Sequence, residues 1–375
     1  MNEKEIAEIR RRFSPQKTNI TSVHGCCVNE KREITAEFCQ SLANLTQDET
    51  EALLTLLKKL LSGSVDRNLL DIEFSNEQVL HGEEHKRLLK LRDSSLSDEA
   101  RLKQLFADII SSVKTEGSFL ILAASDSYDV FTYTEDGKKS EDSTELFKYF
   151  VCGVFPMKMT KPQLSFAAFD STFKNIVSNA VICPPELGFM FPAFDDRAAN
   201  IYNTVFYTKD SGEDHTEIIG KLFAAKPPMP ADSQRETFNT LLSEATDGES
   251  NLEIIKNLQD EIGEMIADRK ERKEYEPLSF SRDDICDILR SADVSDERID
   301  GFKEGFNQSF GEKARLNPQN LVETKRLELA SADISIKINP ERSELVQTRV
   351  IDGVKYILIR ADEEIEVNGV PININ

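Results

Sequence analysis

The chain contains few of the residues and motifs that usually identify an enzyme. Its 375 residues include no tryptophan and only four histidines. Neither GxGxxG nor GxxxxGK[ST], the two loops that commonly hold phosphate groups, is present. A GxSxG nucleophile elbow and a kinase signature set are also missing. Acid–base chemistry would therefore depend on a few histidines or on carboxylates. We expect no cofactor and favour a protein that is not an enzyme.

Long hydrophobic runs are absent too. The N-terminal sequence MNEKEIAEIRRRF lacks the roughly 7–15 apolar residues of a signal peptide. No window approaches the roughly 18 apolar residues of a membrane span. The cysteines form no CxxC pair, which is typical of a reduced protein that uses them as small core residues. We therefore expect a cytoplasmic protein without disulfides, whose six cysteines are Cys26, Cys27, Cys39, Cys152, Cys183 and Cys286.

Positive charge is in deficit. Asp plus Glu total 67 against 46 Lys plus Arg, a formal net charge of −21, while 39% of residues are hydrophobic. That hydrophobic fraction predicts a folded core with an acidic surface. Carboxylates repel nucleic-acid phosphates and anionic membranes, so we expect no direct contact with either. A protein partner with a basic surface would be attracted. Solubility alone is the favoured explanation of the charge, and the sequence leaves the oligomeric state open.

Length and composition predict several domains with an α+β multidomain fold, because single cores rarely exceed roughly 250 residues. The chain divides into five segments by composition. In order, these are a mostly helical region with an N-terminal β-hairpin at 1–116, a central Phe-rich α/β domain at 117–225, a linker with a short helix at 226–250, a charged helical segment at 251–316, and an antiparallel β unit at 317–375.

The first segment carries clear helix signals. Acidic residues begin the expected helix at 3–12 and Arg10, Arg11 and Arg12 end it, which complements the helix dipole. Two β-leaning runs around 29–31 predict a hairpin. Three further helices are expected, at 46–62 with a Thr46–Glu49 capping box, at 77–92, and at 97–113.

The central segment holds 13 of the 22 phenylalanines. We interpret them as core filling and not as a ligand pocket. The sequences GSFLILAA and YDVFTYT predict paired strands that end in a turn at 135–137, and LSFAAF, LGFMFPAF and TVFYT predict further strands. Helices are expected at 143–155 and 214–224.

The C-terminal third changes from helices to hairpins. A Ser233–Glu236 capping box predicts a helix after the proline-rich linker, and three more helices are expected at 251–274, 281–290 and 295–310. The first of these could contact a partner, but packing on its own domain is the favoured interpretation. Asp352-Gly353 and Asn368-Gly369 predict two-residue hairpin turns.

One metal-binding pattern is present. The sequence HGEEH fits the HxxEH pattern of inverted zinc peptidases, in which His81 and His85 would bind zinc and Glu84 would activate water. Gly82 weakens a helix at this point, and the region expected to supply a third ligand reads FPMKMTKPQ. A solvated helix start is therefore favoured, and a metal-dependent hydrolase remains the alternative function.

A second possible ligand group comprises His24, Cys26, Cys27 and Cys39. Adjacent residues of a strand point to opposite faces, so Cys26 and Cys27 cannot easily reach one metal ion. We regard this group as less favourable than the HxxEH pattern.

Four stretches carry a family resemblance: EIAEIRRRFSPQKTNITSVHGCCVNEKREI, SYDVFTYTEDGK, PPELGFMFPAFDDRAANIYNTVFYTK and INPERSELVQTRVIDGVKYILI. Together they resemble a bacterial family, known mainly from anaerobic Gram-positive species, that is classified as a domain of unknown function. The resemblance implies a cytoplasmic bacterial protein and transfers no activity.

The leading hypothesis is a non-enzymatic binding or regulatory protein whose partner is another protein. A translation-associated factor is a further alternative, suggested by the acidic multidomain build alone. The Gly-Gly-Gln tripeptide of peptide-releasing factors is absent, so release catalysis of that type is not expected.

Overall fold

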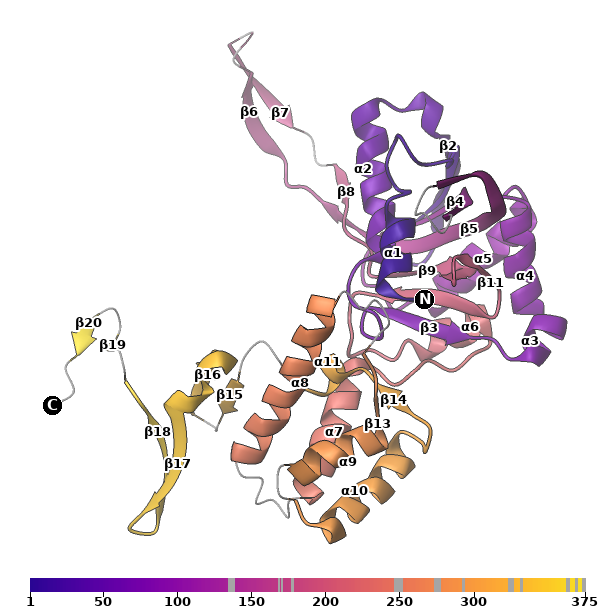
Figure 1. The fold of residues 1–375 in the computed structure, drawn as a ribbon. Helices are drawn as coiled ribbons and strands as arrows, with labels where there is room; N and C mark the ends of the chain where they lie inside the picture. The colour runs from indigo at the N-terminus through magenta and orange to yellow at the C-terminus, as the bar shows by residue number, and fades with distance from the viewer. Residues whose placement is uncertain are drawn as a thin grey trace. The chain divides into compact units, whose positions relative to one another are not determined.

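The structure is a computed structural model that describes residues 1–133, 139–167, 169, 171–176, 179–245, 252–272, 278–291, 294–322, 327–330, 333–361, 365–367 and 370–372. The chain forms two compact units, residues 1–230 and 231–375 (Figure 1).

An antiparallel sheet forms the centre of the first unit. Its strands lie in the order β2-β1-β4-β5-β9-β12-β3, and β8 pairs with the end of β5. Strands from 1–116 and from 117–225 therefore share one sheet. The division of the chain into five domains stays a prediction. The strands are β1 (Ser22–Val28), β2 (Ile34–Ser41), β3 (Leu69–Glu73), β4 (Phe119–Tyr133), β5 (Lys139–Met159), β8 (Ala180–Ile182), β9 (Leu187–Phe191) and β12 (Asn203–Thr208).

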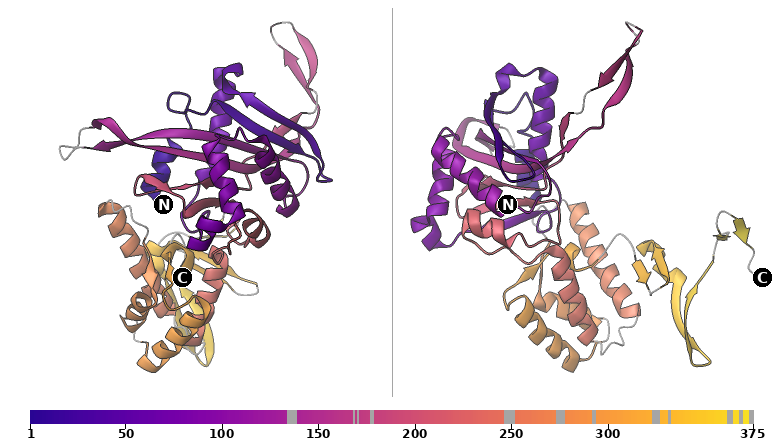
Figure 2. Two further views of the ribbon diagram at one scale, coloured as in Figure 1. Left: turned by 90° about the vertical axis from the view of Figure 1, so that its right-hand side faces the viewer. Right: turned by 180° about the vertical axis from the view of Figure 1, so that it is seen from behind.

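Helices cover both faces of this sheet (Figure 2). In β4, Phe119 and Ile121 join the core that includes α4, α5 and α6, whereas Leu120 and Leu122 join the core that includes α1 and α2. Successive residues of a strand point to opposite faces, so both sides of a fully covered strand must be apolar. The helical elements are α1 (Glu3–Arg10), η1 (Leu42–Asn44), α2 (Gln47–Lys58), η2 (Lys59–Leu61), α3 (Asn76–His81), α4 (Glu83–Asp93), α5 (Glu99–Ser112) and α6 (Thr216–Phe223).

The helix expected at 143–155 is wrong, because these residues lie within β5. Phe150, Cys152 and Val154 contribute to one core, and Tyr149, Val151 and Phe155 contribute to the other. A strand buried on both faces loses the polar–apolar alternation that identifies a strand in sequence.

Two glycines let a helix approach the middle of the sheet. Gly153 of β5 and Gly188 of β9 are paired residues. A Cβ atom added to either would lie within 2.5 Å of the Leu60 side chain. Both positions therefore require glycine for the close packing of η2 against the sheet.

Most elements expected in the first segment are confirmed. The hairpin is β1–β2, and the Thr46–Glu49 capping box opens α2. The helix expected at 97–113 is α5, whereas the helix expected at 77–92 is divided at Gly82 into α3 and α4. Two further strand pairs are β6 (Gln163–Ala167) with β7 (Thr172–Ile176), and β10 (Ala193–Asp195) with β11 (Ala198–Asn200).

The second unit has its own helical core, to which Leu258 and Ile262 of α8 contribute. The favoured interpretation of this charged helix, packing on its own domain, therefore fits the structure. Ser233 does not cap a helix, because α7 already begins at Ala231. The elements are α7 (Ala231–Ala245), α8 (Leu252–Arg272), β13 (Phe280–Ser281), α9 (Arg282–Ser291), α10 (Asp296–Ser309), β14 (Arg315–Leu316) and α11 (Pro318–Leu321).

The C-terminal residues form antiparallel two-stranded pairs, as expected. Asp352 and Gly353 have φ values of 52° and 80°, which confirms the two-residue turn between β17 and β18. The turns expected at 135–137 and 368–369 lie outside the described residues. The elements are β15 (Leu327–Ala330), β16 (Ser335–Ile338), η3 (Pro340–Leu345), β17 (Val346–Ile351), β18 (Val354–Ile359), β19 (Ile365–Val367) and β20 (Val370–Ile372).

In the described part of the chain, no helix combines the length and the apolar character needed to cross a bilayer.

Candidate functional site

A cavity of about 690 Å³ lies in the first unit at the start of α6. The end of α5, the segment 113–116, and the loop 209–215 that follows β12 line it. His215 lies at this wall, is almost fully buried, and has a left-handed backbone conformation with φ 50°. The combination of a cavity and a buried histidine makes this a first candidate for a functional site.

The imidazole of His215 fixes the loop. Its Nε2 lies 2.7 Å from Thr208 Oγ1, and this hydroxyl also donates to the carbonyl oxygen of Asp210 at 2.7 Å. Since the hydroxyl has one proton, Nε2 donates to Thr208. Burial lowers the pKa of His215 below 6.5, although the Glu213 carboxylate raises it. The Thr208 side chain is buried and fully used in these bonds, so it is not an available nucleophile.

The charge of this cavity is mostly negative. Five carboxylates and two lysines line it, and Lys114 pairs with Glu213 at 3.5 Å. Exposed ion pairs of this kind stabilise a structure by at most about 1 kcal/mol. The arrangement can attract a small cation, but the hydrogen bonds of His215 and Thr208 hold the loop in place.

The HxxEH residues lie on two separate helices. His81 ends α3, and both Glu84 and His85 belong to α4. His85 is 1% exposed, and its Nε2 lies 2.8 Å from the carbonyl oxygen of Ile201. His81 is exposed.

The break occurs at Gly82, which has an extended backbone with φ −64° and ψ 129°. Among the described residues, His81, Glu84 and His85 do not form a group whose ligand atoms could share one metal ion. The zinc hypothesis therefore gains no support from this geometry and stays a prediction.

The second ligand group is brought together only in part. His24 and Cys39 are directly paired across β1 and β2, with Nε2 and Sγ 3.9 Å apart. Cys26 is buried and Cys27 is half-buried. Burial raises the pKa of the Cys26 thiol to about 11, so this thiol is a poor metal ligand at neutral pH.

Glu5, Asp195 and Asp196 form an acidic group whose oxygens lie within 4.8 Å of one another. Sequence spacing did not indicate it, since the residues are far apart in the chain. Glu5 already accepts a hydrogen bond from the Asn2 backbone in the capping box of α1. The group is an acidic patch without a second feature that identifies a ligand.

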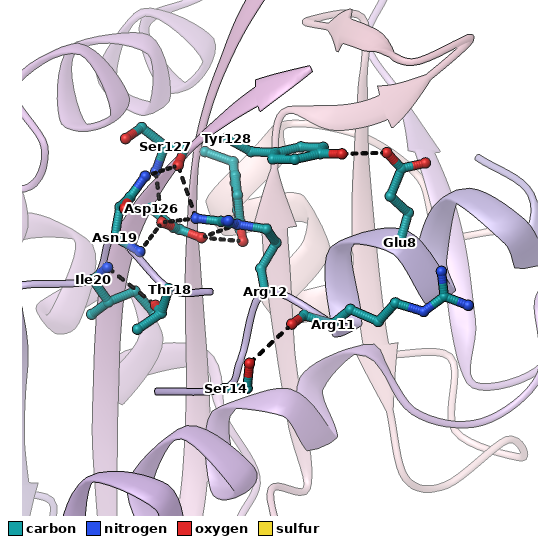
Figure 3. Close-up of polar contacts among 11 residues, drawn as sticks. Glu8, Arg11, Arg12, Ser14, Thr18, Asn19, Ile20, Asp126, Ser127 and Tyr128 are labelled. Atoms are coloured by element: carbon teal, nitrogen blue, oxygen red, sulfur yellow. Dashed lines mark hydrogen bonds and ion pairs between the residues drawn. The ribbon is translucent and has the colours of Figure 1, made fainter. Parts of the chain in front are cut away.

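A polar network attaches the N-terminal segment to the sheet (Figure 3). Arg12 Nε donates to Asp126 Oδ2 at 3.2 Å, and the Asn19 backbone amide donates to Oδ1 at 2.8 Å. Tyr149 donates its hydroxyl proton to Oδ2 at 2.9 Å. Burial and the Asp126 charge raise the pKa of Tyr149 well above its usual value.

In the same network, Arg12 lies over the ring of Tyr128, whose hydroxyl donates to Glu8 Oε1 at 2.6 Å (Figure 3). The buried carboxylate, the arginine and the tyrosines satisfy one another. The network is therefore structural. It gives Arg12, the last of the three consecutive arginines, a role in holding the N-terminal segment to the sheet.

Among the described residues of the first unit, the most exposed large apolar side chains lie on a long hairpin. We call residues 157–182 the apolar arm; it includes β6, β7 and β8, and it extends away from the helix-covered sheet (Figures 1 and 2). Phe169 is 88% exposed, Phe173 is 71% exposed and Leu164 is 72% exposed. Phe166 and Phe173 lie 5.2 Å apart, so their rings form one exposed aromatic pair.

The arm also differs from the rest of the chain in charge. It contains Lys158, Lys161 and Lys174 against one acid, Asp170, in a chain with a net charge of −21. The expected core position of the phenylalanines is wrong for the described Phe166, Phe169 and Phe173, which are exposed. The sequence feature that could have indicated their exposure is the lysines on either side, Lys158 and Lys161 before them and Lys174 after them.

The family model of DUF4317, a domain of unknown function, matches residues 1–370. The chain therefore belongs to this family, which confirms the resemblance. The expected bacterial and Gram-positive distribution stays a prediction. No curated protein matches the chain.

Proposed function

We propose that this member of the DUF4317 family is a non-enzymatic binding protein that engages another protein through the apolar arm. The observation that supports the proposal is the exposure of Leu164, Phe166, Phe169 and Phe173 on one hairpin. Large apolar side chains gathered on a surface mark interaction sites, because water contact with them is unfavourable.

The partner is a protein with an apolar groove bordered by carboxylates. Phenylalanine side chains are suitable anchors, because burying one contributes about 1.5–3 kcal/mol. Lys158 and Lys161 stand at the base of the arm, where they would face the border of such a groove. The acidic body of the chain repels nucleic acids and anionic lipids, which favours a protein over either.

The cavity beside His215 supports an enzymatic function less well. Its imidazole is used to hold Thr208 and its loop, and the surrounding lysine and carboxylate side chains are exposed. The arm, by contrast, exposes large apolar side chains to solvent.

The test compares affinity capture by the full chain and by the double variant Phe166→Ser/Phe173→Ser. A partner qualifies only when it is recovered in stoichiometric amount and then binds the purified chain in a titration. We expect the double variant to weaken that binding at least about tenfold, since two anchors are lost. Tyr202→Ser, which changes an aromatic residue of the same unit that is 44% exposed, is the matched control and should bind normally.

Equal capture of the partner by the wild type and the arm variant would contradict the proposal. So would binding of the arm to vesicles containing anionic lipid, if Phe166→Ser/Phe173→Ser abolishes it and no protein partner is recovered. That result would assign the arm to a membrane surface.

A further inference from the structure

A second cavity, of about 430 Å³, lies in the first unit between α4 and α5. We call it the α4–α5 cavity. Its lining includes four cations, Lys86, Arg87 and Lys90 from α4 and Arg101 from α5, and two carboxylates, Glu83 and Glu84. Cations therefore outnumber carboxylates in this lining, although the whole chain has a net charge of −21. They come together because one turn of α4 places residues three and four apart on one face.

A buried carboxylate positions the guanidinium of Arg87. Arg87 Nη1 donates to Asp108 Oδ2, and Gln104 donates its amide to Oδ1 of the same carboxylate at 3.0 Å. Asp108 is buried, so the pair is shielded from water. One edge of the guanidinium is thereby fixed.

Two donor atoms of Arg87 have no acceptor among the residues that the structure describes. Its Nε and Nη2 atoms are buried and make no hydrogen bond within the described part of the chain. Leaving a buried donor unpaired costs roughly 1–3 kcal/mol, and more when the group is charged. An anion that enters the cavity would supply acceptors for both atoms, and guanidinium binds phosphate oxygens in this two-point manner.

The cations at the border of the cavity can change partners. Lys86 pairs with Glu83 at 3.0 Å, and Arg101 pairs with Asp98. Both members of each ion pair are at least partly exposed. Such pairs are weak, so a phosphate can compete for the cations. Ala100 and Arg101 also belong to the first turn of α5, whose dipole attracts negative charge.

We propose that the α4–α5 cavity binds the phosphate group of a small phosphorylated molecule. Arg87 provides two fixed donors, and Lys90 and Arg101 provide mobile cations at the border. An anion reaches these two Arg87 atoms only after neighbouring side chains move, because both atoms are buried. The volume is within the roughly 300–1,000 Å³ of small-molecule sites, which leaves room for an organic group beside the phosphate.

The test uses the full chain and two probes, inorganic phosphate and glycerol 3-phosphate, in calorimetric titrations at constant ionic strength. We expect saturable binding of at least one probe to a single site. Lys90→Gln/Arg101→Gln and Arg87→Lys should each weaken it at least about tenfold, which corresponds to the loss of one charge-assisted hydrogen bond. Arg87→Lys keeps a cation opposite Asp108, and the double variant changes only border residues.

Lys17→Gln/Lys59→Gln is the matched control. It removes two exposed lysines outside the cavity and should leave binding unchanged. Tighter binding of glycerol 3-phosphate identifies a phosphorylated organic molecule as the ligand, and equal or tighter binding of inorganic phosphate identifies the free ion. The proposal is overturned if neither probe saturates a site below about 10 mM, an affinity too weak to be specific. Equal weakening by the control and by the site variants also overturns it.

Discussion

At the scale of single residues, the Asp126 network explains how the N-terminal segment is held. Asp126 is buried with its carboxylate bonded to Arg12, Asn19 and Tyr149. Asp126→Asn should leave the half-buried Arg12 cation without its counter-charge. We expect a loss of about 3 kcal/mol in the free energy of unfolding, measured by urea denaturation.

Asp129→Asn is the control for that experiment, because Asp129 is exposed on the same strand. It should change the free energy of unfolding by less than about 0.5 kcal/mol. Equal losses in the two variants would show that the buried Asp126 carboxylate contributes no more to the free energy of unfolding than an exposed one.

The two histidines of the HxxEH pattern should behave differently. His85 packs between the rings of Phe74 and Phe191 and bonds the carbonyl oxygen of Ile201. His85→Ala should therefore reduce the free energy of unfolding by about 2–4 kcal/mol, whereas the exposed His81→Ala should change it by less than about 0.5 kcal/mol. Native mass spectrometry distinguishes this structural role of His85 from the zinc hypothesis. The zinc hypothesis requires bound zinc in the wild type that both variants lose.

His215 should make stability depend on pH. Its pKa is below 6.5 in the folded protein because burial disfavours the charged form. The unfolded chain therefore binds more protons as the pH falls through about 6.5, and stability decreases with it. We expect the urea concentration at the unfolding midpoint to decrease as the pH is lowered from 7.5 to 5.5.

His215→Gln should show a smaller decrease over the same pH range, because glutamine can donate to Thr208 without titrating. His24, whose pKa burial also lowers, contributes equally to both proteins. An identical pH dependence of the wild type and the variant would contradict this explanation.

Sequence could not identify the important residues at this scale. Asp126 and Arg12 are 114 positions apart, and nothing in either local pattern indicates the contact. The HxxEH spacing was visible, but the extended backbone at Gly82 separates its histidines. Gly82 itself was the local signal that favoured a structural interpretation.

At the scale of elements, sequence was most informative where local chemistry decides the structure. Capping residues predicted α2, and the Asp352-Gly353 turn predicted the β17–β18 hairpin. It failed at β5, where burial on both faces removes alternation. Phe147, Phe150 and Val151 then follow a spacing that also fits a helix.

The arm is an element whose exposure has a consequence for stability. Phe166→Ser/Phe173→Ser removes side chains that contact little within the described chain, so the free energy of unfolding should change by less than about 0.5 kcal/mol. Urea denaturation measures this. A loss above about 2 kcal/mol would mean that the phenylalanines are buried in the folded protein, which would contradict the proposed docking role.

At the scale of the whole molecule, the two units have separate cores. The sheet unit, residues 1–230, holds two apolar clusters, and the helices of residues 231–375 hold a third. Residues 1–230 should therefore fold without the rest and show one cooperative urea transition with native-like circular dichroism. A fragment that is unfolded in water would show that its core needs residues 231–375.

Composition predicted the α+β multidomain fold, but not how the segments join. Pairing of β1 with β4 and of β3 with β12 combines residues from the first two expected segments in one sheet. Such long-range pairing depends on the register of whole strands, which local patterns do not record. The acidic charge suggested a binding protein, and the structure adds the apolar arm as the surface on which that proposal depends.

The most direct test of the central proposal is site-specific photo-crosslinking from position 169, which is 88% exposed on the arm. A crosslinker at position 169 should capture one protein partner in living cells, and the same crosslinker at Tyr202 should not. Phe166→Ser/Phe173→Ser in the same chain should abolish the crosslink. A crosslink that persists in this variant, or equal capture from positions 169 and 202, would contradict the arm as the binding surface.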